Sequence, residues 1–458
     1  MSTNVREKIK QLAAERILIM DGAMGSMLSE YKSELKGCND LFCVTKPELI
    51  SGIHEAYLKA GADIIETCSF NANAISLGDY GMADMAYKIN AAAAQLARKA
   101  ADAFSSPDKP RFVAGSIGPT SKSASISPDI NDPGKRAVTW DELESAYYDN
   151  ARGLLDGGAD MIVIETVFDA LNAKAGISAV RRLAGELGID LPVIVSATVM
   201  SNGGRLITGQ SIEAFCVSVF HADPLALGLN CSFGAEKLKA SVAAVSAMAP
   251  CLVSAYPNAG LPNHLGAYDE SPDSMADQIE GYLREGLVNV VGGCCGSTPA
   301  HIAAIAERAK KYPPRSAPVS RKGTLLAGLE IMDFDKKRFL AEREGREKTA
   351  GEIQALILQG EYEDAVDIAR DMVEGGASIM EVRIDGANPK AKSAITGFLN
   401  FALQYPDLSR LPFMIESSSL EIIEAGLKCL PGKSLVNYTG SKECDAEFLR
   451  ASYGAEVL

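Results

Sequence analysis

The sequence lacks a long hydrophobic run: no stretch approaches the roughly 20 apolar residues that span a bilayer, and the N-terminus has no apolar core of a signal peptide. It also lacks an excess of positive charge, since 45 lysines and arginines stand against 59 aspartates and glutamates, for a net charge of -14. This balance excludes nucleic acid or an anionic membrane as the main partner. We therefore expect a cytoplasmic protein.

The common signatures of structural metal sites are absent as well. The chain has no CxxC pair and no HxxxH pair, and its four histidines lie apart at positions 54, 221, 264 and 301. The ten cysteines are not expected to form disulfides in a reducing compartment. Seven of them stand singly in ordinary segments, where a thiol behaves as a small hydrophobe: Cys38, Cys43, Cys68, Cys216, Cys251, Cys429 and Cys444.

From residue 17 onward, short β-rich apolar runs alternate with longer helical segments, which predicts parallel strands joined by crossover helices. Eight such units predict an α/β fold of the (β/α)8 or TIM barrel type over residues 1–312. The predicted strands are residues 17–21, 63–69, 112–116, 161–165, 192–198, 225–230, 251–256 and 289–293. The predicted helices are residues 47–60, 82–104, 141–156, 170–187, 211–220, 235–248, 274–285 and 299–311.

A proline-rich, basic stretch without periodicity follows, and we interpret residues 313–324 as a linker. In residues 325–458 the alternation resumes and predicts a partial second barrel-like domain. Its predicted strands are residues 378–384, 413–416 and 434–437, its predicted helices are residues 362–374, 391–402 and 420–430, and the final GAEVL resembles the start of another strand. An open edge exposes apolar surface, so we expect either a second copy or another protein to cover it, or the chain to be a piece of a longer protein.

Three cysteines stand just past the ends of predicted strands, where a (β/α)8 barrel carries its active site. Cys231 follows the sixth strand, and Cys294 and Cys295 follow the eighth, with flanking glycines that permit both sulfurs to turn inward. Zinc suits thiolates, and three protein ligands with one open position are typical of a catalytic site. We therefore predict a zinc site that binds and deprotonates a substrate thiol. The alternatives are a vicinal disulfide or two ordinary core thiols.

Other strand ends carry groups suited to an amino acid. Asp21 and the glycines of the following DGAMG loop can receive an ammonium group and a carboxylate. Glu165 ends the fourth strand, and Glu66, Thr67 and Asn71 lie at or just past the end of the second. Carboxylates from different strands that share one rim with three cysteines favour a binding site over a structural role.

The ordered motifs DGAMG, ETCSFNAN, GSIGPT, IET, GLNCSFGA and GGCCGSTPAHI resemble the homocysteine S-methyltransferase family, most closely the N-terminal module of cobalamin-dependent methionine synthases. The resemblance implies that Cys231, Cys294 and Cys295 bind zinc and act in catalysis. It also implies that homocysteine is methylated to methionine after binding to Asp21, Gly22, Ala23, Thr67, Glu165 and Asn230.

Residues 325–458 resemble the start of the folate-binding, or pterin-binding, barrel of the same enzymes, but the ligand motifs differ. An aspartate and an asparagine of the second strand are replaced by Glu381 and Arg383, and the usual IDSS strand reads IESSS. An arginine in place of an asparagine changes both charge and size at the hydrogen-bonding edge of a pterin. We therefore expect no folate binding here. The resemblance then implies a methyl donor such as methylcobalamin, or another methylcorrinoid, carried by a separate corrinoid protein.

Two other interpretations remain open. In the first, the enzyme methylates homocysteine from a sulfonium or betaine donor. In the second, the chain is a non-catalytic partner that binds homocysteine or a corrinoid protein. The half-barrel also leaves open a homo-oligomer in which a second copy covers its edge.

Overall fold

The computed structural model describes residues 5–29, 38–200, 203–318, 323–343, 347–384, 387–440 and 443–458. Its first sheet has eight parallel strands in the order β1-β8-β7-β6-β5-β4-β3-β2, and an isolated parallel bridge between Met20 and Ile64 joins the two ends of this order. The predicted (β/α)8 barrel is therefore confirmed. The strands are β1 (Leu18–Ile19), β2 (Ile64–Glu66), β3 (Phe112–Ile117), β4 (Met161–Val167), β5 (Val193–Ala197), β6 (Ala226–Gly234), β7 (Leu252–Asn258) and β8 (Val290–Val291).

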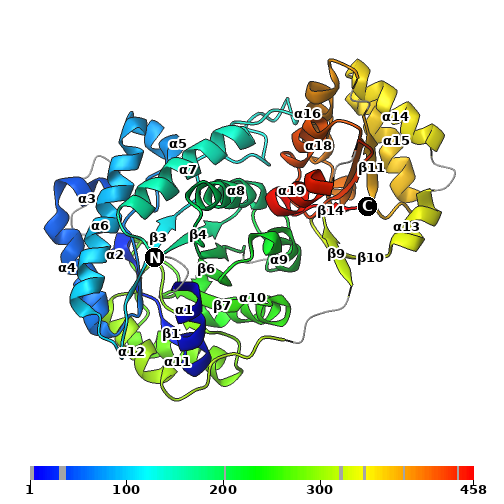
Figure 1. The fold of residues 1–458 in the computed structure, drawn as a ribbon. Helices are drawn as coiled ribbons and strands as arrows, with labels where there is room; N and C mark the ends of the chain where they lie inside the picture. Colours follow the sequence, from blue (N-terminus) through cyan, green and yellow to red (C-terminus); the bar gives the residue numbers. More distant parts are fainter. Residues whose placement is uncertain are drawn as a thin grey trace.

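Helices surround this barrel and cover the outer face of the strands (Figure 1). The crossover helices are α4 (Pro47–Ala60), α6 (Ala86–Phe104), α7 (Trp140–Asp156), α8 (Ala170–Leu187), α9 (Ile212–Val219), α10 (Ala235–Met248), α11 (Pro272–Arg284) and α12 (Pro299–Ala309). Shorter pieces are α2 (Met24–Met27), η3 (Asn39–Leu41), α3 (Phe42–Thr45), α5 (Ala74–Gly78), η4 (Ala83–Met85) and η5 (Phe220–Ala222). The helix predicted over 82–104 differs, because its first turn is the separate η4.

The amino end of the barrel is closed by a helix that the sequence analysis does not predict. Ile9 and Ala13 of α1 (Val5–Glu15) belong to the same buried cluster as the interior residues Leu18 and Ile64. The carboxyl-terminal end of the strands is therefore the end of the barrel that remains open for a functional site.

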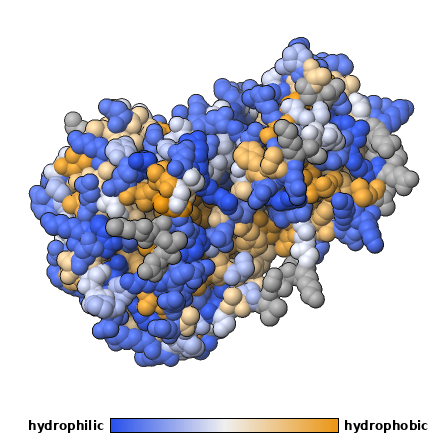
Figure 2. All heavy atoms as spheres, in the orientation of Figure 1, coloured by the Kyte–Doolittle hydropathy of each residue, from blue (hydrophilic) through white to orange (hydrophobic). Residues whose placement is uncertain are grey.

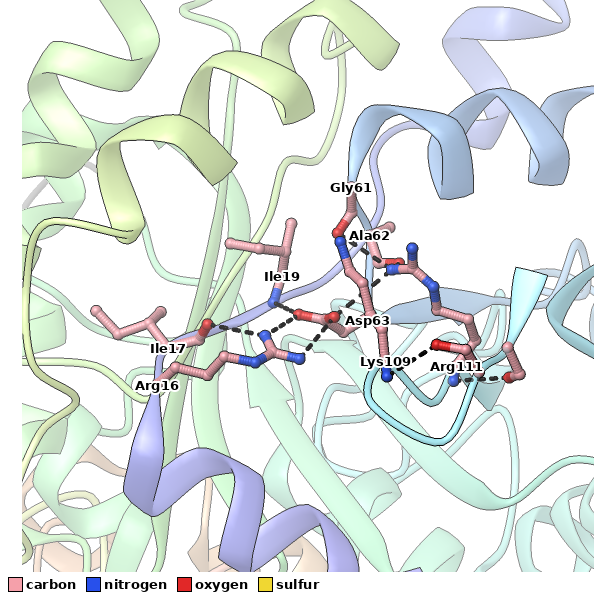
Figure 3. A network of polar contacts seen from close by, with 10 residues as sticks. Arg16, Ile17, Ile19, Gly61, Ala62, Asp63, Lys109 and Arg111 are labelled. Carbon is pink, nitrogen blue, oxygen red and sulfur yellow. Dashed lines mark hydrogen bonds and ion pairs between the residues drawn. The ribbon is translucent and has the colours of Figure 1, made fainter.

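A polar network secures the seam where β1 meets β2 (Figure 3). Arg16 donates to both carboxylate oxygens of the buried Asp63 at 2.6 and 2.9 Å, and the Ile19 amide donates to Asp63 Oδ2 at 3.0 Å. Arg111 Nη1 lies 3.5 Å from Asp63 Oδ1 and also donates to the carbonyl of Ala62. Because β1 has only two residues, these contacts reinforce the closure on which the rim above depends.

The second region contains a hairpin, β9 (Thr324–Ala327) and β10 (Ile331–Phe334), and a parallel sheet in the order β11-β12-β13-β14. The three predicted strands appear as β11 (Met380–Arg383), β12 (Phe413–Ser417) and β13 (Leu435–Tyr438), and the predicted last strand is β14 (Glu456–Val457). Its helices are α13 (Lys336–Arg343), α14 (Glu347–Gln359), α15 (Tyr362–Glu374), α16 (Ala391–Ala402), α17 (Pro406–Ser409), α18 (Leu420–Leu427) and α19 (Glu443–Tyr453). One face of the sheet is covered by the hairpin and α13, because Leu326 and Phe339 form a buried cluster with Ile379, Met414 and Leu435.

Buried polar contacts join the two regions. Lys174 of α8 is fully buried and donates to the carbonyls of Leu430 and Gly432 at 3.1 and 2.9 Å. Gln210 donates to the carbonyl of Gly328 at 2.9 Å. Hydrophilic side chains cover most of the face shown in Figure 2, with apolar patches among them. Among the described helices, none is both long and apolar enough to cross a bilayer.

Candidate active site

Three thiols meet at the carboxyl end of the barrel. Cys231 lies near the end of β6, and Cys294 and Cys295 follow β8. Their sulfur atoms all lie within 4.8 Å of one another, and the Cys231 and Cys295 sulfurs are 3.9 Å apart. All three side chains are partly exposed, so the cluster faces the open end of the barrel.

The backbone around the thiols adopts uncommon conformations. Cys231 and Ser232 have φ angles of 60° and 65°, in the left-handed region that residues with a Cβ rarely occupy. Gly296 also has a positive φ of 82°, and a Cβ there would meet the ring of Tyr268. On the strand β7 side, the Cys294 amide donates to the carbonyl of Pro257 at 2.8 Å. Strain of this kind is held in place by surrounding structure and is common at functional sites.

The thiols influence one another strongly. Hydrogen bonds from Cys231 and Cys294 lower the pKa of Cys295 to about 3, whereas contacts with Cys231 and Cys295 raise the pKa of Cys294 well above its ordinary value. The first thiolate therefore forms readily and disfavours the next. Three thiolates need a nearby cation before all of them can ionise.

Polar side chains form a layer inside the barrel, below the thiols. Alternation along a strand places residues two apart on the same face. Ile64, Ala114, Val163, Ile194, Ala226 and Tyr256 belong to the interior cluster. Continuing this alternation to the strand ends brings six polar side chains into one layer: Glu66, Ser116, Glu165, Ser196, Asn230 and Tyr256.

Glu165 is held firmly within this layer. Its Oε1 accepts a hydrogen bond from Ser116 Oγ at 2.5 Å, and its Oε2 accepts one from Asn230 Nδ2 at 3.1 Å. Asn230 is in turn fixed because its Oδ1 accepts from the Thr166 amide at 2.9 Å and from Ser196 Oγ at 2.7 Å. Two predicted substrate contacts, Glu165 and Asn230, are therefore in direct contact with each other.

Asp21 lies beside this layer at the β1–β2 seam. It is only 2% exposed, and its Oδ2 accepts a hydrogen bond from the Glu66 amide at 3.0 Å, while its Oδ1 is buried without a partner. In the loop that follows, the Ala23 amide donates to Ser297 Oγ at 3.1 Å. A Cβ at Gly22 would lie 2.8 Å from the same Ser297 Oγ, so this position requires glycine for close packing. The loop that carries Gly22 and Ala23 is thus bound to the segment that carries the cysteine pair.

Thr67 is buried, but its hydroxyl is already engaged. It accepts from the Ser116 amide at 2.9 Å and shares a hydrogen bond with Ser69 Oγ at 2.6 Å. Thr67 therefore connects β2 to β3 in this structure. Through Ser116 it is linked to Glu165.

Three carboxyl groups converge with no lysine or arginine paired to any of them in the described part of the chain. Burial raises the pKa of Glu165 to about 7, and burial together with mutual repulsion raises the pKa values of Asp21 and Glu66 well above their ordinary range. A cation bound beside these carboxyl groups would stabilise their ionised forms and lower their pKa values again. The barrel end thus combines a place for a positive charge with three metal-ligating sulfurs.

Two further residues belong to this site, and the sequence analysis does not single them out. Tyr256 and Asn258 of β7 are 1% and 3% exposed; the Tyr256 hydroxyl lies beside Ser196, and Asn258 Oδ1 is buried without a hydrogen-bond partner. β7 lies between β6 and β8, the strands that carry the cysteines. In the sequence, the only signals that could have identified these two residues are their spacing of two along the strand and their position at its end.

Comparisons with known proteins agree with this geometry. The family described as homocysteine S-methyltransferase matches residues 18–309, and the family described as pterin binding enzyme matches residues 353–458. The homocysteine methyltransferase MmuM from Escherichia coli is similar in fold. Its oxidized form is 24% identical, with a TM-score of 0.52 and coverage of 65% of this chain and 97% of that one. Its metallated form is also 24% identical, with a TM-score of 0.51 and coverage of 65% and 98%.

Proposed function

The chain belongs to the homocysteine S-methyltransferase family, so it is a methyltransferase acting on homocysteine, and we propose that it does so at a zinc site with a methylcorrinoid as donor. Zinc would be held by Cys231, Cys294 and Cys295. The single observation that carries this proposal is the convergence of these three sulfurs on the same barrel end as a cluster of buried carboxyl groups.

The sulfur spacing fits zinc. A tetrahedral ion with zinc–sulfur bonds of about 2.3 Å places its sulfur ligands about 3.8 Å apart. The Cys231 and Cys295 sulfurs are 3.9 Å apart. When bound there, zinc would lower the pKa of the substrate thiol, so that the thiolate is present near neutral pH.

The chain's own residues would orient the substrate. Asp21 supplies an unpartnered carboxylate oxygen for the ammonium group, and Glu165 adds negative charge from a position fixed by Ser116 and Asn230. The sulfur then attacks the methyl carbon in line with the leaving bond. A carbon–sulfur bond forms as the bond between the methyl group and its donor breaks, and the electron pair of that bond leaves with the donor.

The second region supports a donor from outside this chain. On β11 and β12, Arg343 donates to both oxygens of Glu381 at 2.6 and 2.8 Å, and Arg383 Nε lies 2.7 Å from Glu416 Oε1. Asn437 donates to Glu416 Oε2 at 2.7 Å. These ion pairs tie up most of the polar groups described at this position, although Arg383 Nε, close to Glu416, makes no well-aligned hydrogen bond, and we propose that the sheet does not bind folate. We therefore propose a methylcorrinoid as the donor, with a sulfonium or betaine donor as the alternative.

A direct test measures bound zinc and methionine formation from homocysteine and free methylcobalamin. We expect about one zinc per chain. Cys294→Ala should lose the zinc and lower turnover at least about a thousandfold, because one ligand of the site is missing. Cys444→Ala, which removes an exposed thiol of α19, is the matched control and should change neither quantity.

Two outcomes would contradict the proposal. Full activity in the metal-free Cys294→Ala protein would refute the zinc site. Methionine formed from a sulfonium or betaine donor, with none formed from methylcobalamin, would refute the corrinoid donor while leaving the acceptor intact.

A further inference from the structure

The carboxylates below the thiols differ in how many of their oxygens remain available. Both oxygens of Glu165 accept hydrogen bonds, from Ser116 and from Asn230. Asp21 Oδ1 and Glu66 Oε1, in contrast, are buried and accept none. An acceptor left unsatisfied in the interior is energetically costly, so a pair of them at one seam of the barrel requires an explanation.

Glu66 is placed to act together with Asp21. It follows Ile64 by two residues on β2, so its side chain enters the barrel interior. Its backbone amide is bonded to Asp21 Oδ2 at 3.0 Å, which fixes the two residues side by side across the seam. The charges of both Glu165 and Asp21 act on the carboxyl group of Glu66, so all three acids lie close together.

A ligand that satisfies both free oxygens must bring several N–H donors and a positive charge. A primary ammonium group has three such donors and one charge. The Tyr256 hydroxyl, 1% exposed and close to Ser196, lies close enough to Glu66 and Glu165 for their charges to raise its pKa. The buried, unpartnered oxygens of Asp21 and Glu66, with the Tyr256 hydroxyl nearby, therefore offer acceptors suited to an ammonium group.

We propose that Glu66 is a specificity-determining residue whose Oε1 accepts an N–H from the substrate ammonium group, beside Asp21 Oδ1. This assignment rests on homocysteine as the substrate of the proposed function. Glu165 then acts mainly as a positioning residue, because Ser116 and Asn230 already occupy an orbital on each of its oxygens. The pocket thereby selects thiols that carry an amino group over those that lack one.

Calorimetric titration of the zinc-loaded chain with two thiols tests this role. Homocysteine carries the amino group, and 4-mercaptobutanoate lacks it but keeps the thiol and the carboxylate. Glu66→Gln preserves size and removes charge, and we expect it to weaken homocysteine binding at least about tenfold while changing 4-mercaptobutanoate binding less than about twofold. Glu66→Asp, which keeps the charge with a shorter reach, should fall between the two proteins.

The matched control is Glu55→Gln on the surface of α4, where the carboxylate is paired with Lys59 and lies away from the site. It should leave both titrations unchanged. Unchanged homocysteine binding in Glu66→Gln, or equal weakening of both thiols, would overturn the role of Glu66 alone. Failure of homocysteine to bind the unsubstituted chain would overturn the proposed substrate and this inference with it.

Discussion

In the first barrel, the strand-end carboxylates Asp21 and Glu66 each keep one buried oxygen without a partner, whereas in the second sheet Glu381 and Glu416 are each paired with arginines. Both groups belong to parallel sheets, and Glu416, like Asp21 and Glu66, lies at the carboxyl end of its strand, whereas Glu381 lies within β11. In such sheets this edge is where ligands usually bind.

The difference teaches that position alone does not make a binding site. A ligand gains affinity where it satisfies atoms that the protein leaves unsatisfied, and it gains little where it must first break ion pairs that are already formed. The first site has acceptors and thiols that need a cation, whereas the second has balanced its own charges. Three substitutions test how far this contrast extends.

The largest effect is expected from Asp21→Asn. The substitution removes the negative charge beside the free Oδ1 and places an amide where the ammonium group should bind. We expect homocysteine to bind about a hundredfold more weakly, equal to about 2.7 kcal/mol, because a charge-assisted hydrogen bond is lost in a buried site. Calorimetric titration of the zinc-loaded protein measures the change.

The control for this comparison is Glu416→Gln, which neutralises a strand-end carboxylate of the second region. Homocysteine binding should be the same as in the unsubstituted chain. A loss as large as that of Asp21→Asn would show that the two strand-end groups are functionally coupled and would end the contrast between them.

A smaller effect, on stability, is expected from Arg343→Met. Arg343 bonds Glu381 and is also paired with Glu416, so its removal leaves two largely buried carboxylates with only Arg383 and Asn437. We expect the free energy of unfolding to fall by about 2 kcal/mol, since breaking such a network leaves charge uncompensated. Denaturant unfolding measures this loss, and Arg338→Met, an exposed neighbour on α13, should show little change.

The same second region should give no saturable binding of methyltetrahydrofolate up to about 1 mM in the unsubstituted chain. Tight folate binding that Arg383→Asn strengthens or weakens would place a working pterin site at these strand ends. Such binding would contradict the argument that the ion pairs of Glu381 and Glu416 prevent folate from binding, on which the choice of another donor depends.

Periodicity was enough to predict the barrel, and strand ends were enough to predict that Cys231, Cys294 and Cys295 converge. The local signals agree there, because each strand is short, apolar and followed by a helix. The distinction between Glu165 and Glu66 was not predictable, since each is simply a carboxylate near the end of a strand. Side chains from β3 and β6 donate hydrogen bonds to Glu165 and leave Glu66 Oε1 without a partner. Such long-range contacts cannot be predicted from the local sequence pattern.

Backbone conformation and long-range packing set the other limits. Cys231 has a left-handed φ although the sequence has no glycine at that position to indicate it. Similarly, α1 closes the barrel through contacts with residues that are distant from it in the sequence. In the second region, the altered motif is the sequence basis for our proposal that no folate binds there. The arginine from α13 that completes the ion-pair network was visible only in the fold.

The smallest effect concerns Lys174, which joins the two regions. Its ammonium group is fully buried against the carbonyls of Leu430 and Gly432, and burial lowers its pKa to about 7. In the unfolded chain the pKa is about 10.4, so between these values the unfolded chain binds the proton that the folded chain has released. Raising the pH from about 7 to about 8 therefore stabilises the folded state through this group, by about 1 kcal/mol.

Comparison with Lys174→Met isolates this contribution. Unfolding of both proteins in denaturant at pH values across this window should show the stability difference moving in favour of the unsubstituted chain as the pH rises. Lys428→Met, which removes an ion pair with the exposed Asp141 at the same junction, should give a curve parallel to that of the unsubstituted chain. Parallel curves for Lys174→Met as well would mean that Lys174 keeps its proton in the folded state, so that the junction holds a charged lysine.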